Sequence, residues 1–417
     1  MTTLNASLSH ASSPDDNDRP HQFLGLAPLM RQSLAGIDLK PLGTQLIAHL
    51  ATHADDAYAL LDLSIVLQLI GNRELALATQ MEALQLQQIY RLPATGKTTL
   101  RVLAMVAPGD LMANTPLEFL LEDSGMSLDL MYIGKGVPPI EDVPEHDVLF
   151  VAIGESDANR PLLQELENIT REWPRPVLNH PERITRLARD HACDLLQKDP
   201  TIVMPVSVRI DRHTLQEIAH GKLAIDALIE NGTYPVIVRP VGSHAGKDLQ
   251  KMTSAEDIVT YLHTVSAEEF YVARFVDYRS RDGLFRKYRI MLIEGQPFIS
   301  HMAISTHWMI HYLNAGMADN ADKRAEEARF METFDTDFAV RHQGAFRTIS
   351  EQIGLDYVGV DCGETRDGKL LIFEVDSDMI VHAMDPVDLF PYKPARMHKL
   401  FDAFRVMLGK IVQNIPA

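Results

Sequence analysis

The sequence lacks features that mark several large classes of protein. Only two cysteines, Cys193 and Cys362, occur in 417 residues, which excludes a disulfide-built scaffold and predicts a reducing, cytoplasmic location. No run of about 18 apolar residues is present, so no membrane span is expected. Basic residues are outnumbered, with 39 Lys and Arg against 57 Asp and Glu and a net charge of −18. Such a chain has no overall attraction for nucleic acid or anionic membranes.

Signatures of common enzyme classes are also missing. There is no Gly-x-Gly-x-x-Gly, and no arrangement typical of a Ser/His/Asp or Cys/His nucleophile. The segment Gly96-Lys97-Thr98-Thr99 imitates the end of a P-loop, but Arg91 stands where that loop requires glycine. The predicted strand also follows the segment instead of preceding it. We therefore exclude a P-loop.

The N-terminal part is predicted to be helical. Residues 1–20 are rich in Ser, Asp and Asn and lack the regions of a signal peptide, so we expect a disordered leader. Residues 21–95 carry apolar residues at three- and four-residue spacing, which predicts helices. A spacing that resembles one tetratricopeptide repeat is formed by Leu63-Ser64, Gly71, Ala76 and Ala83. An ordinary helical hairpin is the alternative. A single repeat cannot bury its own face, so this region should pack on a neighbour or bind a protein or peptide partner.

The remaining chain divides into two regions that differ in their predicted secondary structure. From residue 96 to 182 strands and helices alternate, which predicts a small parallel sheet with helices on its faces. After residue 183 the pattern predicts an α+β body with antiparallel sheets. In that body we expect a helix over 183–196, a single strand over 202–209 and a helix over 213–230.

Carboxylates follow two apolar segments near the C-terminus. Asp361 leaves the first predicted strand, and Glu374 and Asp376 leave the second, two residues apart and therefore on one face. Three converging carboxylates suit a hard cation such as Mg²⁺, which usually also binds substrate phosphates. A hairpin with solvated acids is the alternative.

Cations and glycines follow other strands. Arg239 ends a buried strand, and the loop after it, Gly242-Ser243-His244-Ala245-Gly246-Lys247, could bring backbone N–H groups onto phosphates. An ordinary hairpin turn is the alternative. Arg289 lies inside an apolar strand, where an unpaired cation is costly, so it should meet a carboxylate or a phosphate.

One further apolar strand, 270–276, turns acidic at Asp277. Its edge could present backbone groups to a purine, with Asp277 or Asp282 near the ribose. A plain core strand is the alternative.

The order of these segments over residues 98–415 resembles the ATP-grasp superfamily, especially the branch of glutathione synthetase and the ribosomal-protein glutamate ligase. The resemblance implies an ATP-grasp fold of two α+β subdomains, 183–276 with the glycine-rich loop and 277–417 with the metal site. A small α/β domain, 96–182, and the helical region, 21–95, would precede them.

The resemblance also implies roles for individual residues. ATP would lie between the subdomains, the glycine loop (Gly242, Ser243, His244, Gly246, Lys247) would close over its phosphates, and Arg239 and Arg289 would clamp them as catalytic groups. Arg274, Phe275, Val276 and Asp277 would form the hinge that meets the nucleotide. Asp361, Glu374 and Asp376 would hold Mg²⁺, expected as two ions. Three positions depart from the family pattern: Arg274 replaces an acid, His191 a phosphate-binding lysine, and Asp376 an asparagine.

The function implied by the resemblance is an ATP- and Mg²⁺-dependent carboxylate–amine ligase that forms an amide or peptide bond through an acyl phosphate. Small-molecule or peptide acids and amines would be its substrates, and a homodimer is one expected state. A non-catalytic nucleotide-binding scaffold and an ATP-grasp kinase are the alternatives. Under the ligase hypothesis, Glu374→Ala or Asp361→Ala should abolish ATP turnover and leave the fold intact.

Overall fold

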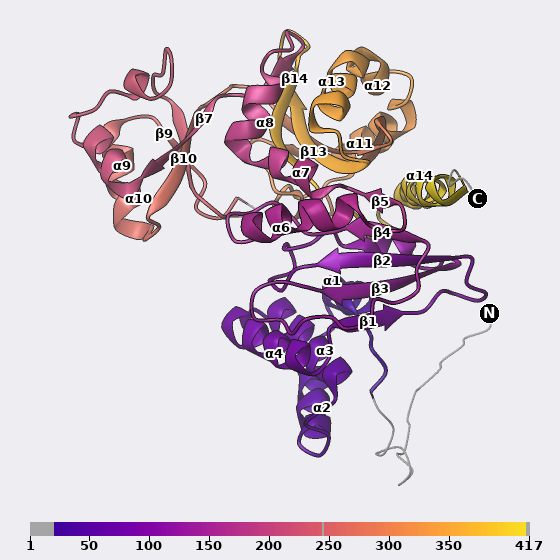
Figure 1. The fold of residues 1–417 in the computed structure, drawn as a ribbon. Helices are drawn as coiled ribbons and strands as arrows, with labels where there is room; N and C mark the ends of the chain where they lie inside the picture. The colour runs from indigo at the N-terminus through magenta and orange to yellow at the C-terminus, as the bar shows by residue number, and fades with distance from the viewer. Residues whose placement is uncertain (1–20, 244–245, 414–417) are drawn as a thin grey trace.

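A computed structural model describes residues 21–243 and 246–413. The described chain is a mixed α+β protein with three sheets, as the sequence predicts. Figure 1 shows the N-terminal helices and the first sheet below, and two lobes built on the second and third sheets above. No helix in the described ranges is both long enough and apolar enough to cross a membrane.

Four helices form the N-terminal region. They are α1 (Leu26–Leu34), α2 (Lys40–Leu50), α3 (Ala57–Leu69) and α4 (Arg73–Leu86). Helix α3 is buried along most of its length because it is apolar on nearly every side. Ala76 and Ala83 of α4 are fully buried. The helix pair expected around Gly71 is confirmed, and its assignment to the tetratricopeptide class stays a prediction.

The first sheet has the strand order β1-β3-β2-β4-β5. Strands β2 (Leu100–Val106), β3 (Met126–Tyr132), β4 (Val148–Val151) and β5 (Val177–Leu178) are parallel, with α5 (Leu117–Leu121) and α6 (Arg160–Arg171) between them. Strand β1 (Ile89–Leu92) pairs with β3 antiparallel. The prediction of helices over residues 21–95 was therefore wrong at its end, where residues 89–92 form a strand. Tyr90 is completely buried and holds this edge strand in the core.

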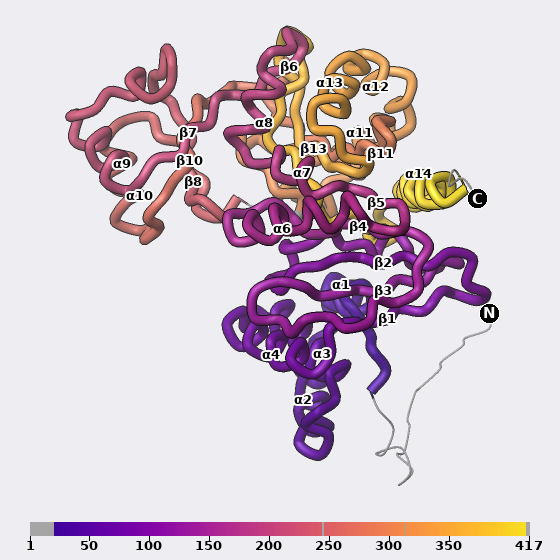
Figure 2. Tube along the Cα trace, viewed as in Figure 1, coloured from indigo at the N-terminus to yellow at the C-terminus, as the bar shows by residue number. Residues whose placement is uncertain are grey.

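The second sheet forms a lobe of its own and has the antiparallel order β7-β10-β8-β9. Its strands are β7 (Ser207–Asp211), β8 (Val236–Pro240), β9 (Gln250–Met252) and β10 (Glu269–Arg274). Helices α9 (Arg212–Ala219) and α10 (Ala255–Thr264) pack on it through an apolar cluster with Leu215, Tyr261 and Phe270. Figure 2 traces this lobe projecting from one side of the molecule.

The third sheet has the order β12-β11-β13-β14-β6. Strands β11 (Phe285–Ile293), β12 (Gln296–Ser305), β13 (Tyr357–Glu364) and β14 (Leu370–Asp376) are antiparallel, and the short β6 (Ile202–Val203) joins β14 in parallel. Helices α11 (Ala321–Thr333), α12 (Phe338–Arg341) and α13 (Gln343–Ile353) accompany this sheet. The last helix, α14 (Lys393–Gln413), shares an apolar cluster with the first and third sheets.

Three predicted elements break into shorter ones. The strand over 202–209 splits into β6 and β7, which belong to different sheets, because Pro205 between them has no N–H for a ladder. The helix over 213–230 ends at Ala219, and Gly221 follows with a φ of 69°. The helix over 183–196 becomes α7 (Pro181–Ile184) and α8 (Arg189–Leu196), joined by a short 3₁₀ turn.

Asn179 ties the first sheet to the third. It is fully buried at the end of β5, and its side-chain oxygen accepts the N–H groups of Asp356 and Tyr357 at 3.0 Å. Its amide nitrogen donates to the carbonyl of Tyr357 at 2.8 Å. These bonds satisfy both the oxygen and the nitrogen of the Asn179 side-chain amide, and they connect the first sheet to the third sheet.

Candidate nucleotide-binding and active site

A cavity of about 500 Å³ lies where the second sheet, the third sheet and the N-terminal helices come together. Its size falls within the usual range for small-molecule sites. Residues far apart in sequence line it, from Met30 of α1 to Lys393 at the start of α14. Three zones can be distinguished in the cavity: an apolar slot, a zone of paired charges, and a second apolar end.

The apolar slot lies beside the predicted hinge. Its walls come from both lobes: Ile237 and Ala273 of the second sheet face the slot, as do Leu371 and Phe373 of β14. The hinge residues Arg274, Phe275 and Val276 also line it. Phe275 is held by the Lys251 ammonium, 3.8 Å from its ring centre, and by an edge-on contact with Trp308. A slot of this kind suits a flat ring such as a purine base.

The charged zone is a row of side chains across four strands of the third sheet. The strand register places His301 opposite Arg289, Arg289 opposite Asp361, and Asp361 opposite Glu374. Directly opposite residues on neighbouring strands project from one face, so the row points to one side. The sheet thus brings Arg289 and two of the predicted carboxylates together.

Asp361 is the centre of this row. Arg289 donates two hydrogen bonds to it, from Nε to Oδ1 at 2.8 Å and from Nη2 to Oδ2 at 2.9 Å. Lys287 forms a second ion pair, with its Nζ 2.6 Å from Oδ2 of Asp361. The Asp361 side chain is only 1% exposed. Burial alone would raise its pKa, but the two cations outweigh burial and hold the pKa of Asp361 well below its ordinary value. Asp361 is therefore ionised and already neutralised by protein groups.

Glu374 and Asp376 occupy the next positions. Arg189 at the start of α8 forms an ion pair with Glu374 and donates to the Phe373 carbonyl at 3.1 Å. Burial raises the pKa of Glu374, but Arg189 and Arg239 outweigh that effect and lower it. For Asp376, burial and the charge of Glu374 outweigh the hydrogen bonds from Asp378 and the attraction of Arg189, and they raise its pKa to about 6. Asp378 is 3% exposed, and burial and Asp376 raise its pKa well above the ordinary value.

The carboxylates differ from the predicted metal site in one respect. Among residues 21–243 and 246–413, no group of three or more His, Cys, Asp or Glu side chains is arranged to hold a metal ion. The expectation that Asp361, Glu374 and Asp376 converge on one ion is not met, because Asp361 is turned toward Arg289 and Lys287. Mg²⁺ commonly takes one or two carboxylates and completes its shell with phosphate and water. Glu374 and Asp376 fit that role, since an added cation would relieve the crowding that raises the pKa of Asp376.

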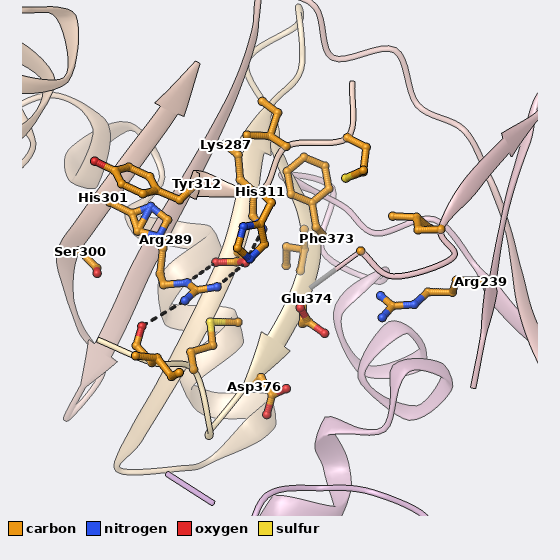
Figure 3. Close-up of a pocket in the computed structure, with 18 of the residues that line it drawn as sticks. Arg239, Lys287, Arg289, Ser300, His301, His311, Tyr312, Phe373, Glu374 and Asp376 are labelled. Carbon is orange, nitrogen blue, oxygen red and sulfur yellow. Dashed lines mark hydrogen bonds and ion pairs between the residues drawn. The ribbon is translucent and has the colours of Figure 1, made fainter. Parts of the chain in front are cut away.

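Arg239 reaches the cavity from the second sheet. Figure 3 shows its guanidinium on one side of Glu374 and that of Arg289 on the other. Arg239 Nε donates to the Ser243 hydroxyl at 3.2 Å, and Nη2 donates to the Ser243 carbonyl. Burial and the nearby Arg189 lower the pKa of Arg239 to about 10. Its bonds to neutral groups of the glycine loop leave its charge without a close carboxylate in the described part of the chain.

The other predicted nucleotide contacts divide into two groups. Gly246 lines the cavity, where it faces Met309, and Ser243 is bonded to Arg239. Gly242 and Lys247 are exposed and do not line it, and His244 lies outside the described residues. Asp277 is exposed, is paired with Arg279 at 2.6 Å and does not line the cavity, and its contact with the ribose stays a prediction.

His191 is the clearest error. It is exposed and lines a separate surface pocket with Asp190 and Asp194. The reason is helical phase: residues two apart on a helix point about 200° from each other. Because Arg189 faces the cavity, His191 cannot do so. Arg189, to which no role was predicted, is the residue of this helix that lines the cavity and pairs with Glu374.

Two further residues were missed. Lys287 stands two positions before Arg289 on the same strand face, and this spacing was a usable signal. Asp378 stands two positions after Asp376, and its burial could not be inferred from spacing. The segment that follows it, with His382 and Asp385, also lines the cavity.

Comparisons with known proteins give a consistent but distant picture. No family model and no curated protein sequence matches this chain. Among solved structures, it is similar to D-alanine–D-alanine ligase from Bacillus anthracis complexed with ATP, at 12% identity and a TM-score of 0.45, covering 76% of this chain and 100% of that one. D-alanyl-alanine synthetase A from Vibrio cholerae O1 biovar eltor is similar at 12% identity and a TM-score of 0.47, covering 77% and 100%. A RimK domain ATP-grasp protein from Sphaerobacter thermophilus is similar at 16% identity and a TM-score of 0.40, covering 75% and 100%.

Proposed function

We propose that this chain is an ATP- and Mg²⁺-dependent carboxylate–amine ligase. The observation that carries the proposal is a single cavity that joins an apolar slot at the hinge to cations and carboxylates from two different sheets. The slot fits the base of ATP. Arg239, with the glycine loop, and Arg289 lie where they would meet phosphate oxygens.

In this proposal the chain acts by positioning and charge. Bound Mg²⁺, held by Glu374 and Asp376, would offset the negative charge of the phosphates. The carboxylate oxygen of the substrate attacks the γ-phosphorus, ADP leaves, and an acyl phosphate forms. An amine then attacks the acyl carbon and inorganic phosphate leaves, giving the amide. Arg239 and Arg289 stabilise the phosphoryl charge in the first step, and no protein nucleophile is needed.

One observation favours a second candidate, a nucleotide-binding scaffold without turnover. Asp361 is neutralised by Lys287 and Arg289 and is not free to contact a metal ion in this arrangement. A scaffold would bind Mg²⁺ and ATP in the same cavity and release no ADP.

The test is mass spectrometry of reactions that contain the full chain, ATP, Mg²⁺ and pooled amino acids, small carboxylic acids and short peptides. A ligase gives ADP and a product lighter than its two substrates by one water. A phosphorylated product without amide formation would show a kinase, and ATP binding without ADP would show a scaffold.

A matched pair of variants ties the activity to the cavity. Glu374→Gln keeps the size of the side chain and removes its charge, and we expect ADP formation to fall by about 100- to 1,000-fold. Glu351→Gln makes the same change at an exposed position of α13 and should leave the rate unchanged. Normal turnover in purified Glu374→Gln would contradict the assignment.

A further inference from the structure

The cavity continues past the carboxylates to the N-terminal helices. Its far end is lined by Met30, Ser33 and Leu34 of α1, by Leu69 at the end of α3, and by Met112 in the loop after β2. None of these side chains is charged, and four of the five are apolar. Leu34 is 45% exposed although it is a large apolar residue. This end of the cavity is therefore an apolar surface that directly continues the charged zone.

Helix α1 is fixed against the active-site body. Ala27 and Met30 share an apolar cluster with Phe119 of α5, and Ile380 and Met384 from the segment after β14 pack against it. Glu118 accepts the N–H of Ala27 at 3.0 Å. A wall built on a packed helix holds its shape better than one built on a loop. The wall is thus a defined surface that can discriminate among ligands.

The cavity lining also includes a buried cation outside the row on the third sheet. Lys393 is 2% exposed, lies 3.1 Å from Asp385 and 3.5 Å from Glu327, and sits over the ring of Tyr312 at 4.2 Å. The lining thus has a charge gradient, from the charged side chains around Arg289 and Glu374 to the five uncharged side chains of the far end. A ligand that matches this gradient has a charged group at one end and an apolar group at the other.

We propose that Met30, Leu34, Leu69 and Met112 form a wall that binds the apolar, non-reacting part of the carboxylic-acid substrate. This inference rests on the proposed function, because the acid must place its carboxylate near the phosphate-binding cations. The substrate class is then an acid with an aliphatic or aromatic tail, and the N-terminal helices select it. Each methylene buried against the wall should strengthen binding about fourfold.

The test is calorimetric titration of the full chain, in Mg²⁺ and a non-hydrolysable ATP analogue, with straight-chain acids from butanoic to decanoic acid. The dissociation constant should fall about fourfold for each added methylene that is buried against the wall, until the far end of the cavity is filled. Met30→Trp fills the far end, so the best chain length should shorten by two or more carbons. Met30→Ala and Leu69→Ala enlarge it and should lengthen the preferred acid.

Control variants keep the result interpretable. Leu75→Ala removes an apolar side chain, 58% exposed on α4, that does not line the cavity, and should leave the preference unchanged. Leu34→Trp alters the exposed rim of the wall, and it replaces the Met30 variants as the test if those do not fold. The proposal is overturned if none of the acids binds, if an amine series shows the length dependence instead, or if the wall variants keep the wild-type preference.

Measuring ADP with ATP and the same acids separates this inference from the proposed function. Acids that bind with a length preference but yield no ADP would refute the ligase and leave the wall standing. ADP formation with small polar acids, indifferent to Met30 and Leu34 variants, would support the ligase and refute the wall.

Discussion

The second and third sheets present cations to the same cavity in different ways. On the third sheet, Lys287 and Arg289 both contact Asp361, and burial of Arg289 is outweighed by that carboxylate, so its pKa rises. On the second sheet, Arg239 bonds to the neutral Ser243, and burial and Arg189 lower its pKa to about 10. The first arrangement is complete without a ligand, whereas the second is not. Under the proposed function, a bound phosphate would supply the anion that Arg239 lacks, whereas the cluster of Lys287, Arg289 and Asp361 is also part of the core.

The largest effect should come from breaking the complete cluster. Asp361→Asn leaves two cations in a site where the carboxylate was 1% exposed. Removing one partner of a buried ion pair commonly costs about 3–5 kcal/mol of unfolding free energy. Urea denaturation followed by circular dichroism measures this loss of unfolding free energy. This expectation corrects the earlier one that loss of Asp361 leaves the fold intact, because the structure shows Asp361 balancing two charges.

If Asp361→Asn lowered the unfolding free energy by less than about 1 kcal/mol, the cluster of Lys287, Arg289 and Asp361 would not be part of the core. Replacing the whole cluster with apolar residues of similar size is the control. Such replacements of buried ion pairs are often neutral or stabilising.

The opposite pattern is expected at Arg239. Arg239→Gln removes a buried charge that forms no direct ion pair in the described part of the chain and attracts Glu374 only at longer range, so the unfolding free energy should stay the same or rise. Affinity for ATP should fall, because a hydrogen bond to a charged group contributes about 1.5–3 kcal/mol, or roughly 10- to 150-fold. Thermal unfolding and calorimetric titration with an ATP analogue measure the two effects. If Arg239→Gln destabilised the fold and left ATP affinity unchanged, the two sheets would not differ as described.

Glu118 extends the comparison to a partly buried acid outside the charged zone of the cavity. Burial raises its pKa from 4.5 to about 7, although the N–H of Ala27 at the start of α1 partly opposes the change. The folded state then holds the proton more tightly than the unfolded chain, so this stabilisation is complete below about pH 4.5 and is lost as pH rises through about 7. The loss should be about 1–2 kcal/mol, because the side chain is only partly buried.

Unfolding free energies measured between pH 4.5 and 8 test this prediction. Glu118→Gln should flatten the profile relative to the wild type across that window. An identical pH dependence in both proteins would show that Glu118 titrates normally.

The contrast also explains which parts the sequence could predict. The order of helical, α/β and α+β regions follows from local periodicity and was confirmed. That Arg289 meets a carboxylate or a phosphate followed from the cost of burying an unpaired cation, and the structure supplies Asp361, on the neighbouring strand, as a carboxylate partner.

Other features depend on packing over long sequence distances. The exposure of His191 and the use of Arg189 depend on the rotation of α8 against β14, which no local pattern encodes. Ile380 packs against the cluster that contains Met30, although the two residues are far apart in sequence, so the contribution of α1 to the cavity could not be seen before the chain was folded. The break between β6 and β7 did have a local signal in Pro205.

Hydroxylamine trapping tests the ligase assignment most directly. Hydroxylamine attacks acyl phosphates and yields hydroxamates, so it replaces the unknown amine. With ATP, Mg²⁺, hydroxylamine and a pool of carboxylic acids and amino acids, the wild-type chain should form ADP and hydroxamate in equal amounts, and Glu374→Gln should form neither at a comparable rate. ADP without hydroxamate, or no ADP although ATP binds, would contradict the account.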